Sequence, residues 1–340
     1  MRSFASDNNS GVHTAVIEAI IEANKDHAVG YGDDPWTAAA EAKMKEIFGP
    51  DVAPFFVFNG TGANSVALQS ITRPFNAILC AQTAHIFVDE CGAPAKMSGA
   101  TLIPIPTKDG KLTPELIKPH LVNFGVCHHA QPKAVYISQV SELGTVYTIE
   151  EVKAIADLLH SHDMYLHMDG ARLANACVSL NCSMKAATVD AGVDILSFGG
   201  TKNGMMMGEA VVSFRKEITD NLKFYRKQSA QLASKQRYLA AQFLPYLSNN
   251  LWWDNASHAN LMARKLQHIL QKYPQVTFTQ KMESNQLFFT APKVALDALM
   301  KEYFFYYWNE NIAEARLVTS WDTTEDDLKA IEQSLDKLLA

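Results

Sequence analysis

Lys202 lies in a loop whose composition sets it apart from the other lysines of the chain. The loop follows the apolar run Ile195–Phe198 and carries glycines at positions 199, 200, 204 and 208. Glycines let a backbone approach a ligand closely, and apolar neighbours would take water away from the amine. A desolvated lysine gives up its proton more easily, which suits it to form a Schiff base with an aldehyde. A solvated lysine in a surface loop is the alternative, and this stretch alone does not decide between the two.

Asp169 follows another apolar run, in the stretch YLHMDGAR that spans residues 165–172. In an open α/β sheet, ligands bind at the carboxyl ends of the strands. The carboxylate could instead cap a helix or pair with Arg172. However, a carboxylate after one strand and a lysine after the next, 33 residues later, is the pair that a pyridoxal phosphate enzyme needs. The lysine binds the cofactor aldehyde and the carboxylate binds the ring nitrogen, so we predict pyridoxal 5'-phosphate as the cofactor.

A third stretch, FFVFNGTGAN over residues 55–64, runs from an apolar strand through a glycine turn into a helix. Backbone N–H groups at such a helix start form a phosphate cradle, and the Thr61 hydroxyl would add a donor. Gly60 and Gly62 flank it. The stretch is neither a Walker motif nor a full GxGxxG fingerprint, so by itself it is weak evidence for a phosphate site. The lysine loop and the carboxylate stretch in the same chain strengthen that prediction.

The elements that must position these residues alternate between short apolar runs and periodic helices. Thr148 and Glu151 form a capping box at the start of one helix. The apolar runs are continuous, as in strands covered on both faces of a mainly parallel sheet. We therefore predict a three-layer α/β/α domain. The predicted strands are Phe55–Phe58, Ala77–Cys80, Leu102–Ile105, Ala134–Ser138, Tyr165–Met168, Ile195–Phe198 and Ala210–Phe214.

After Lys216 the pattern changes to longer helices and a small α+β domain. We predict a large domain over residues 1–250, which includes the N-terminal segment, and a small C-terminal domain over residues 251–340. The boundary falls between 245 and 275. The predicted elements are helices at Leu232–Tyr246 and Asn255–Tyr273, strands at Val276–Thr279, Leu287–Thr290, Phe304–Trp308 and Arg316–Ser320, and a final helix with Leu328, Ile331, Leu335 and Leu338 on one face.

Composition narrows the class of protein. The 340 residues carry a net charge of −6 without a basic block, so we expect no nucleic-acid partner. No apolar run is long enough to span a membrane, and the first residues lack the apolar stretch of a signal peptide. Five cysteines without CxxC spacing indicate reduced thiols in a cytoplasmic protein, and we expect no metal site.

In their order along the chain, these motifs resemble those of the L-threonine aldolases, which have the type I pyridoxal phosphate fold (aspartate aminotransferase-like). The resemblance covers nearly the whole chain, and its most specific part is HMDGAR followed by the lysine loop. It implies an aldolase that cleaves β-hydroxy-α-amino acids to glycine and an aldehyde. The matching stretches are Ser6-Asp7, residues 31–35 (YGDDP), residues 59–64 (NGTGAN), residues 85–87 (HIF), residues 90–93 (ECGA), residues 167–172, Thr201-Lys202 and residues 315–319 (ARLVT).

The resemblance also implies roles for single residues. Lys202 would bind the cofactor aldehyde, Asp169 the ring nitrogen, and Gly60, Thr61 and Gly62 the phosphate. His85 would stack on the cofactor ring near the substrate hydroxyl. The substrate carboxylate would be held by Ser6, Arg172 and Arg316, with Arg172 also beside the cofactor, and Tyr31 would line the pocket, from the same or a neighbouring subunit.

Some assignments remain alternatives at this point. A second histidine near the substrate hydroxyl would be His128 or His129, and a further cation for the phosphate would be Lys235 or Arg237. The chain departs from the family pattern at residues 6–10 (SDNNS), 137–142 (ISQVSE) and 201–204 (TKNG), which affects the expected side-chain and stereochemical preference more than the cofactor. A homo-oligomer, dimer or tetramer, is expected. The rival functions are a β-eliminating lyase on an aromatic or sulfur amino acid and a catalytically silent paralogue that binds a partner.

Overall fold

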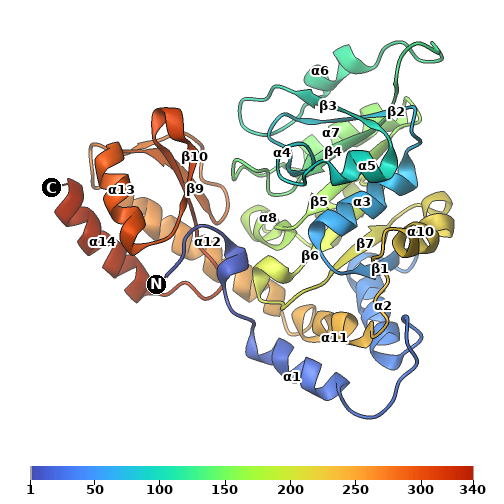
Figure 1. The fold of residues 1–340 in the computed structure, drawn as a ribbon, viewed down its shortest axis with the longest axis horizontal. Coiled ribbons are helices and arrows are strands. Elements are labelled where there is room, and N and C mark those ends of the chain that lie inside the picture. Colours follow the sequence, from blue (N-terminus) through green and yellow to red (C-terminus); the bar gives the residue numbers. More distant parts are fainter. Residues whose placement is uncertain (1, 340) are drawn as a thin grey trace.

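A computed structural model describes residues 2–339 and places a seven-stranded sheet at the centre of this part of the chain (Figure 1). The strand order is β1-β7-β6-β5-β4-β2-β3, and β7 is the one strand of this described sheet that runs against the others. The mainly parallel sheet is thus confirmed, with all seven predicted strands. Their bounds are β1 Ala53–Val57, β2 Asn76–Ala81, β3 Thr101–Ile105, β4 Gln131–Ser138, β5 Tyr165–Gly170, β6 Ile195–Gly199 and β7 Glu209–Ser213.

Helices cover both faces of this sheet, as the continuous apolar strands predict. One face carries α3 and α10, and the other carries α2, α7 and α11. The capping box predicted at Thr148 and Glu151 is present at the start of α7. The helices of this part are α1 Thr14–Ala23, α2 Pro35–Phe48, α3 Gly60–Ile71, α4 His85–Val88, α5 Ala93–Ser98, α6 Pro114–Ile117, α7 Ile149–His160, α8 Leu173–Leu180, α9 Met184–Ala187, α10 Lys216–Gln228 and α11 Arg237–Tyr246, with short 3-10 turns η1 Asp7–Asn9, η2 Lys118–His120, η3 Val189–Ala191 and η4 Thr201–Asn203.

A second, smaller sheet lies in the C-terminal part, with the antiparallel order β10-β11-β9-β8 (Figure 1). The helix α12 contributes Ala256 to the core of the large sheet and Leu266 to the core of the small one. The elements of this part are α12 Leu251–Leu270, β8 Thr277–Phe278, β9 Gln286–Thr290, α13 Lys293–Glu302, β10 Tyr306–Asn309, η5 Glu310–Ile312, β11 Glu314–Val318 and α14 Glu325–Leu339.

The N-terminal segment joins the two parts. Phe4 is buried in the core of the small sheet, its N–H donates to the Phe304 carbonyl (2.7 Å), and its carbonyl accepts from the Val318 N–H (2.8 Å). This pairing carries the following residues, Ser6 and Asp7, toward the large sheet. The first residues therefore pack on the small sheet, whereas the sequence groups them with the large domain.

Several helices of the described chain lie where no helix was predicted, α1, α10 and α13 among them. The helix expected over Leu232–Tyr246 begins only at Arg237. Among residues 2–339, no helix combines the length and apolar character that crossing a bilayer requires.

The parallel strands bring the predicted chemistry to one edge. Asp169 lies near the end of β5, and Lys202 follows the end of β6. The phosphate stretch follows β1 and His85 follows β2, so all four groups lie at the carboxyl ends of strands that run the same way.

The strand that carries Lys202 depends on Phe198, whose fully buried ring packs against Phe48, Phe243 and Tyr246. Phe198→Ala should lower the free energy of unfolding by about 3–5 kcal/mol because it leaves a cavity in the core. Phe224→Ala is the matched control, since that ring is 62% exposed on α10 and its loss should cost less than about 0.5 kcal/mol. Urea unfolding followed by circular dichroism measures both, and equal midpoints would contradict this packing.

Candidate active site

A cavity of about 330 Å³ opens at this edge of the large sheet. It contains the predicted lysine, carboxylate, phosphate loop and histidine together. A smaller cavity of about 70 Å³ adjoins it and reaches Glu90, Glu142 and Arg172. The predicted residues that line the larger cavity are Gly60, Thr61, His85, Asp169 and Lys202.

Asp169 is a buried carboxylate with three hydrogen-bond donors. Its Oδ2 accepts from Asn64 Nδ2 (2.9 Å) and from the Tyr136 hydroxyl (2.8 Å), and its Oδ1 accepts from the Ala171 N–H (2.9 Å). Burial raises the pKa of this carboxyl, but the Asn64 hydrogen bond, the Lys202 charge and the Ala171 N–H outweigh it and hold the pKa below its ordinary value. Asp169 is therefore a stable anion and could hold a proton on a basic ring nitrogen.

Lys202 lies in η4, and the neighbouring Asn203 fixes this turn. Asn203 donates to the Tyr246 hydroxyl (3.1 Å) and to the Trp252 carbonyl (2.8 Å). Burial and the Arg172 charge lower the pKa of Lys202, although Asp7, Asp169 and Glu209 oppose them. No carboxylate of residues 2–339 forms an ion pair with the Lys202 Nζ. The predicted desolvated amine is present and available for an aldehyde.

The phosphate loop begins α3. The Asn59 side chain caps the helix by accepting from the Gly62 N–H (2.8 Å), which leaves Gly60 and Thr61 to line the cavity. Gln231, a residue without a predicted role, holds this loop, because its Oε1 accepts from the Phe58 N–H (3.0 Å). A Cβ atom at position 62 would lie only 2.4–2.6 Å from the Gln231 amide, so any larger residue there would displace this side chain from the loop.

The donor set of this cavity suits pyridoxal phosphate. A helix N-terminus and the Thr61 hydroxyl can hold the phosphate, the Lys202 amine can bond the aldehyde, and the Asp169 anion can hold the ring nitrogen. A Cβ atom built on Gly60 meets nothing within 4 Å, so the start of the loop faces open space.

His85 belongs to the same network through its ring. Its Nδ1 lies 2.8 Å from Glu90 Oε1, and Asn64 Nδ2 donates both to that oxygen (2.8 Å) and to Asp169. The hydrogen bond to Glu90 raises the pKa of His85, with burial opposing it and the Asp169 charge adding to it. Sequence reasoning missed the roles of Asn64, Glu90 and Tyr136, although the first two stand in stretches that it quoted.

The residues expected to bind the substrate carboxylate lie near one another, and the Asp7 carboxylate lies among them. Arg172 donates to Asp7 from Nε (2.7 Å) and Nη2 (2.8 Å), and Asp7 was not predicted to take part. Arg316 donates from Nη2 to the Ala5 carbonyl (3.0 Å), whereas its buried Nε has no partner in the described chain. Burial, together with the Arg172 charge, lowers the pKa of Arg316 to about 10. The Ser6 hydroxyl accepts from the Asn8 N–H (3.2 Å).

Eight predicted residues line neither of these two cavities: Ser6, Tyr31, Gly62, His128, His129, Lys235, Arg237 and Arg316. The Tyr31 ring is 54% exposed, beside Lys227. His128 and His129 are exposed in the loop before β4. Lys235 and Arg237 line a different cavity, where Arg237 donates to the Asp26 carbonyl (3.0 Å).

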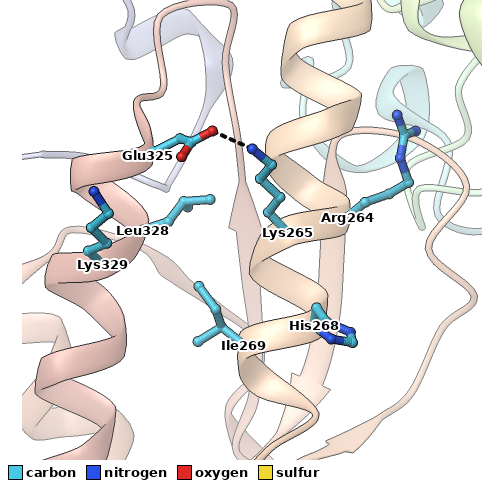
Figure 2. Close-up of a pocket in the computed structure, with 7 residues that line it drawn as sticks. All are labelled: Arg264, Lys265, His268, Ile269, Glu325, Leu328 and Lys329. Carbon is cyan, nitrogen blue, oxygen red and sulfur yellow. Dashed lines mark hydrogen bonds and ion pairs between the residues drawn. The ribbon is translucent and has the colours of Figure 1, made fainter.

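A cavity of about 380 Å³ lies between α12 and α14 and contains none of the predicted site residues (Figure 2). Figure 2 shows Leu328 and Ile269 between the two helices, Lys265 directed toward Glu325, and Arg264 directed away from α14. None of the predicted lysine, carboxylate and phosphate-loop residues lines this groove, so the candidate active site is the cavity at the sheet edge.

The His85–Glu90 contact generates a prediction. Glu90→Gln should lower the pKa of His85, because the amide keeps the shape but removes the charge that favours imidazolium. NMR titration of the His85 ring in the cofactor-free protein measures this pKa. Asp89→Asn removes the same charge from the exposed neighbouring residue and should leave the His85 pKa nearly unchanged. Equal effects of the two substitutions would contradict the assigned contact.

Comparison with known proteins identifies the family of the chain. Residues 3–292 match the model of the beta-eliminating lyase family. The chain is 39% identical over 335 residues to the low specificity L-threonine aldolase of Pseudomonas aeruginosa, covering 98% of this chain and 97% of that protein. It is 38% identical over 340 residues to the low specificity L-threonine aldolase of Pseudomonas sp. (strain NCIMB 10558), covering 100% of this chain and 98% of that one.

A solved structure of Leishmania major threonine aldolase has a TM-score of 0.94 to this chain at 30% identity, with both chains covered completely. The expected type I fold and pyridoxal phosphate dependence are thereby confirmed. The chain belongs to the beta-eliminating lyase family of pyridoxal phosphate-dependent enzymes.

Proposed function

We propose that this enzyme cleaves β-hydroxy-α-amino acids, L-threonine and L-allo-threonine among them, to glycine and an aldehyde. The observation that carries the proposal is the His85–Glu90 pair, which lines the smaller cavity together with Lys202 and Asp169. A retro-aldol cleavage needs a group that takes the β-hydroxyl proton, and this pair supplies one. The two Pseudomonas relatives and the Leishmania structure, all named threonine aldolases, support the same reaction.

The chain would hold the cofactor at three points. Lys202 would bond its aldehyde, Asp169 would keep a proton on its ring nitrogen, and Gly60 and Thr61 would bind its phosphate. Gly62, also predicted for the phosphate, instead donates its N–H to the Asn59 cap. When bound, pyridoxal phosphate supplies the electron sink for the charge released as the Cα–Cβ bond breaks.

Arginines would hold the substrate carboxylate. Arg316 has a buried Nε without a partner in residues 2–339. It therefore has more free N–H donors for the substrate than Arg172. Arg172 is kept in place by Asp7 and can offer its remaining nitrogen. With Ser6, these groups would fix the substituents of Cα relative to the ring.

His85 would act as the general base. Because Glu90 accepts from Nδ1, the neutral ring has Nε2 free to accept the β-hydroxyl proton. A base needs its neutral form, and Glu90 raises the pKa of His85. Cleavage should therefore weaken as the pH falls through that pKa.

Product analysis tests the reaction directly. With added pyridoxal phosphate, the enzyme should release aldehyde and glycine from L-threonine, L-allo-threonine or β-phenylserine. Lys202→Ala should abolish both the release and the covalent attachment of the cofactor, because a methyl group cannot bond the aldehyde. Pyruvate and ammonia as products would indicate the β-eliminating lyase instead, and cofactor-free protein without turnover would indicate a silent paralogue. Fixation of the cofactor by borohydride onto another lysine of Lys202→Ala would contradict the role of Lys202.

We also propose a homo-oligomer, dimer or tetramer, located in the cytoplasm. Tyr31, and Lys235 or Arg237, lie outside the cavity of their own chain and would reach the site of a partner subunit, as would His128 or His129. Apolar side chains exposed near the cavity, Phe58 (40%), Phe87 (46%) and Val88 (57%), support such a contact. The five free cysteines in the described residues support a reducing compartment.

Light scattering tests the assembly. We expect at least a dimer, and Tyr31→Ala should then reduce turnover although its ring is remote from its own cavity. A fully active monomer would contradict the proposal.

A further inference from the structure

Glu209 is a buried acid in the cofactor cavity to which the proposed reaction gives no role. It is the first residue of β7, is 9% exposed and lines the cavity with Lys202 and Thr61. Because β7 runs against its neighbours, its first residue lies at the edge where they end. Glu209 pairs with Val57 of β1 on one side and with Gly199 of β6 on the other.

The backbone leaves room for this carboxyl group. A Cβ atom at position 199 would lie 2.4 Å from Glu209 Oε2, so only glycine allows the carboxyl group its place. No cation of residues 2–339 forms an ion pair with it. The other two acids near Lys202 already have partners. Asp7 accepts two hydrogen bonds from the Arg172 guanidinium, and Asp169 accepts three hydrogen bonds.

The groups that face Glu209 come from four elements. Burial raises its pKa to about 8, opposed by the Thr201 hydroxyl, the Lys202 charge and the Gly200 N–H. The Asp169 charge from β5 contributes to this rise. Tyr246 of α11 is neutral, since burial raises the pKa of that hydroxyl, and His85 lies on the same cavity.

The strand order puts Glu209 at the phosphate end of the cavity. Its neighbour β1 leads directly into the phosphate loop, whereas Asp169, which receives the ring nitrogen, lies beyond β6 on β5. A bound phosphate would therefore add negative charge on the side of Glu209. Two like charges in a buried cavity favour protonation of the weaker acid.

We propose that Glu209 is a proton-carrying part of the cofactor site: in the loaded enzyme it is protonated and serves as a hydrogen-bond donor at the phosphate end. The inference rests on the cofactor site proposed above. The proposal has a thermodynamic consequence. A group whose pKa is higher in the bound protein than in the free protein takes up a proton when the ligand binds. Affinity for the phosphate then falls as the pH rises above the pKa of Glu209 in the free protein, by up to about tenfold per pH unit.

The experiment compares pyridoxal phosphate with pyridoxal, which lacks the phosphate. Dissociation constants for the cofactor-free protein are measured from absorbance between pH 7.5 and 9.5, where the phosphate is already dianionic. The deprotonation of Lys202 changes the affinity for both ligands in the same way. It therefore cancels in the ratio of their two dissociation constants. We expect the preference for pyridoxal phosphate to decline through this range by about tenfold in all.

Glu209→Gln is the decisive variant, because the amide remains a donor but carries no titratable proton. Its preference for pyridoxal phosphate should not change with pH. Glu142→Gln, at a half-buried glutamate that accepts from the His85 N–H in the smaller cavity, should keep the slope of the unmodified protein. A flat preference in the unmodified protein, or the same slope in Glu209→Gln, would overturn the proposal.

Calorimetry of the unmodified protein gives a second readout that needs no variant. Titrations in two buffers with different heats of ionisation count the protons exchanged on binding. At pH 8.5, the binding of pyridoxal phosphate should be accompanied by the uptake of nearly one more proton than the binding of pyridoxal. Equal uptake would overturn the proposal, whereas failure of both ligands to bind would instead refute the cofactor site.

Discussion

The buried negative charge of Asp169 is the constraint on which the site depends. Removing a carboxylate from water costs several kcal/mol unless hydrogen bonds replace the lost solvent, on the order of the penalty for any buried ion. Asn64, Tyr136 and the Ala171 N–H supply those bonds. They come from α3, β4 and the turn after β5, so the anion is stable only when the large sheet and its covering helix are assembled. The fold and the charge therefore stabilise each other.

Asn64 extends this constraint to the second functional group. Its amide donates one hydrogen to Asp169 and one to Glu90, and Glu90 in turn orients the His85 ring. The anion that would bind the cofactor ring and the base that would act on the substrate are thus fixed by one side chain. The other acids of the cavity are treated differently: Asp7 is neutralised by Arg172, whereas Glu209 has no ion-pair partner in the described residues and favours its protonated form. The site thus favours the ionised form of Asp169 and Asp7 and the protonated form of Glu209.

Much of this could be predicted from the sequence, for physical reasons. Continuous apolar runs predicted all seven strands of the large sheet, and parallel strands meet at one edge, which brings Asp169, Lys202, His85 and the phosphate loop together. Contacts between side chains far apart in sequence were not predictable, such as Asp7 with Arg172 or Tyr136 with Asp169, because no local pattern encodes them. The helix α13 was missed although it packs on α14. Tyr31 and Lys235 lie outside their own cavity, so their roles remain predictions about an assembly.

The protonation state of the bound cofactor tests the central claim most directly. Pyridoxal phosphate labelled with ¹⁵N in the ring reports by its chemical shift whether that nitrogen carries a proton. With the ionised Asp169 described above, the ring nitrogen should be protonated at neutral pH, and it should lose that proton in Asp169→Asn while the cofactor remains bound. An unprotonated nitrogen in the unmodified enzyme, or the same shift in both proteins, would contradict the account.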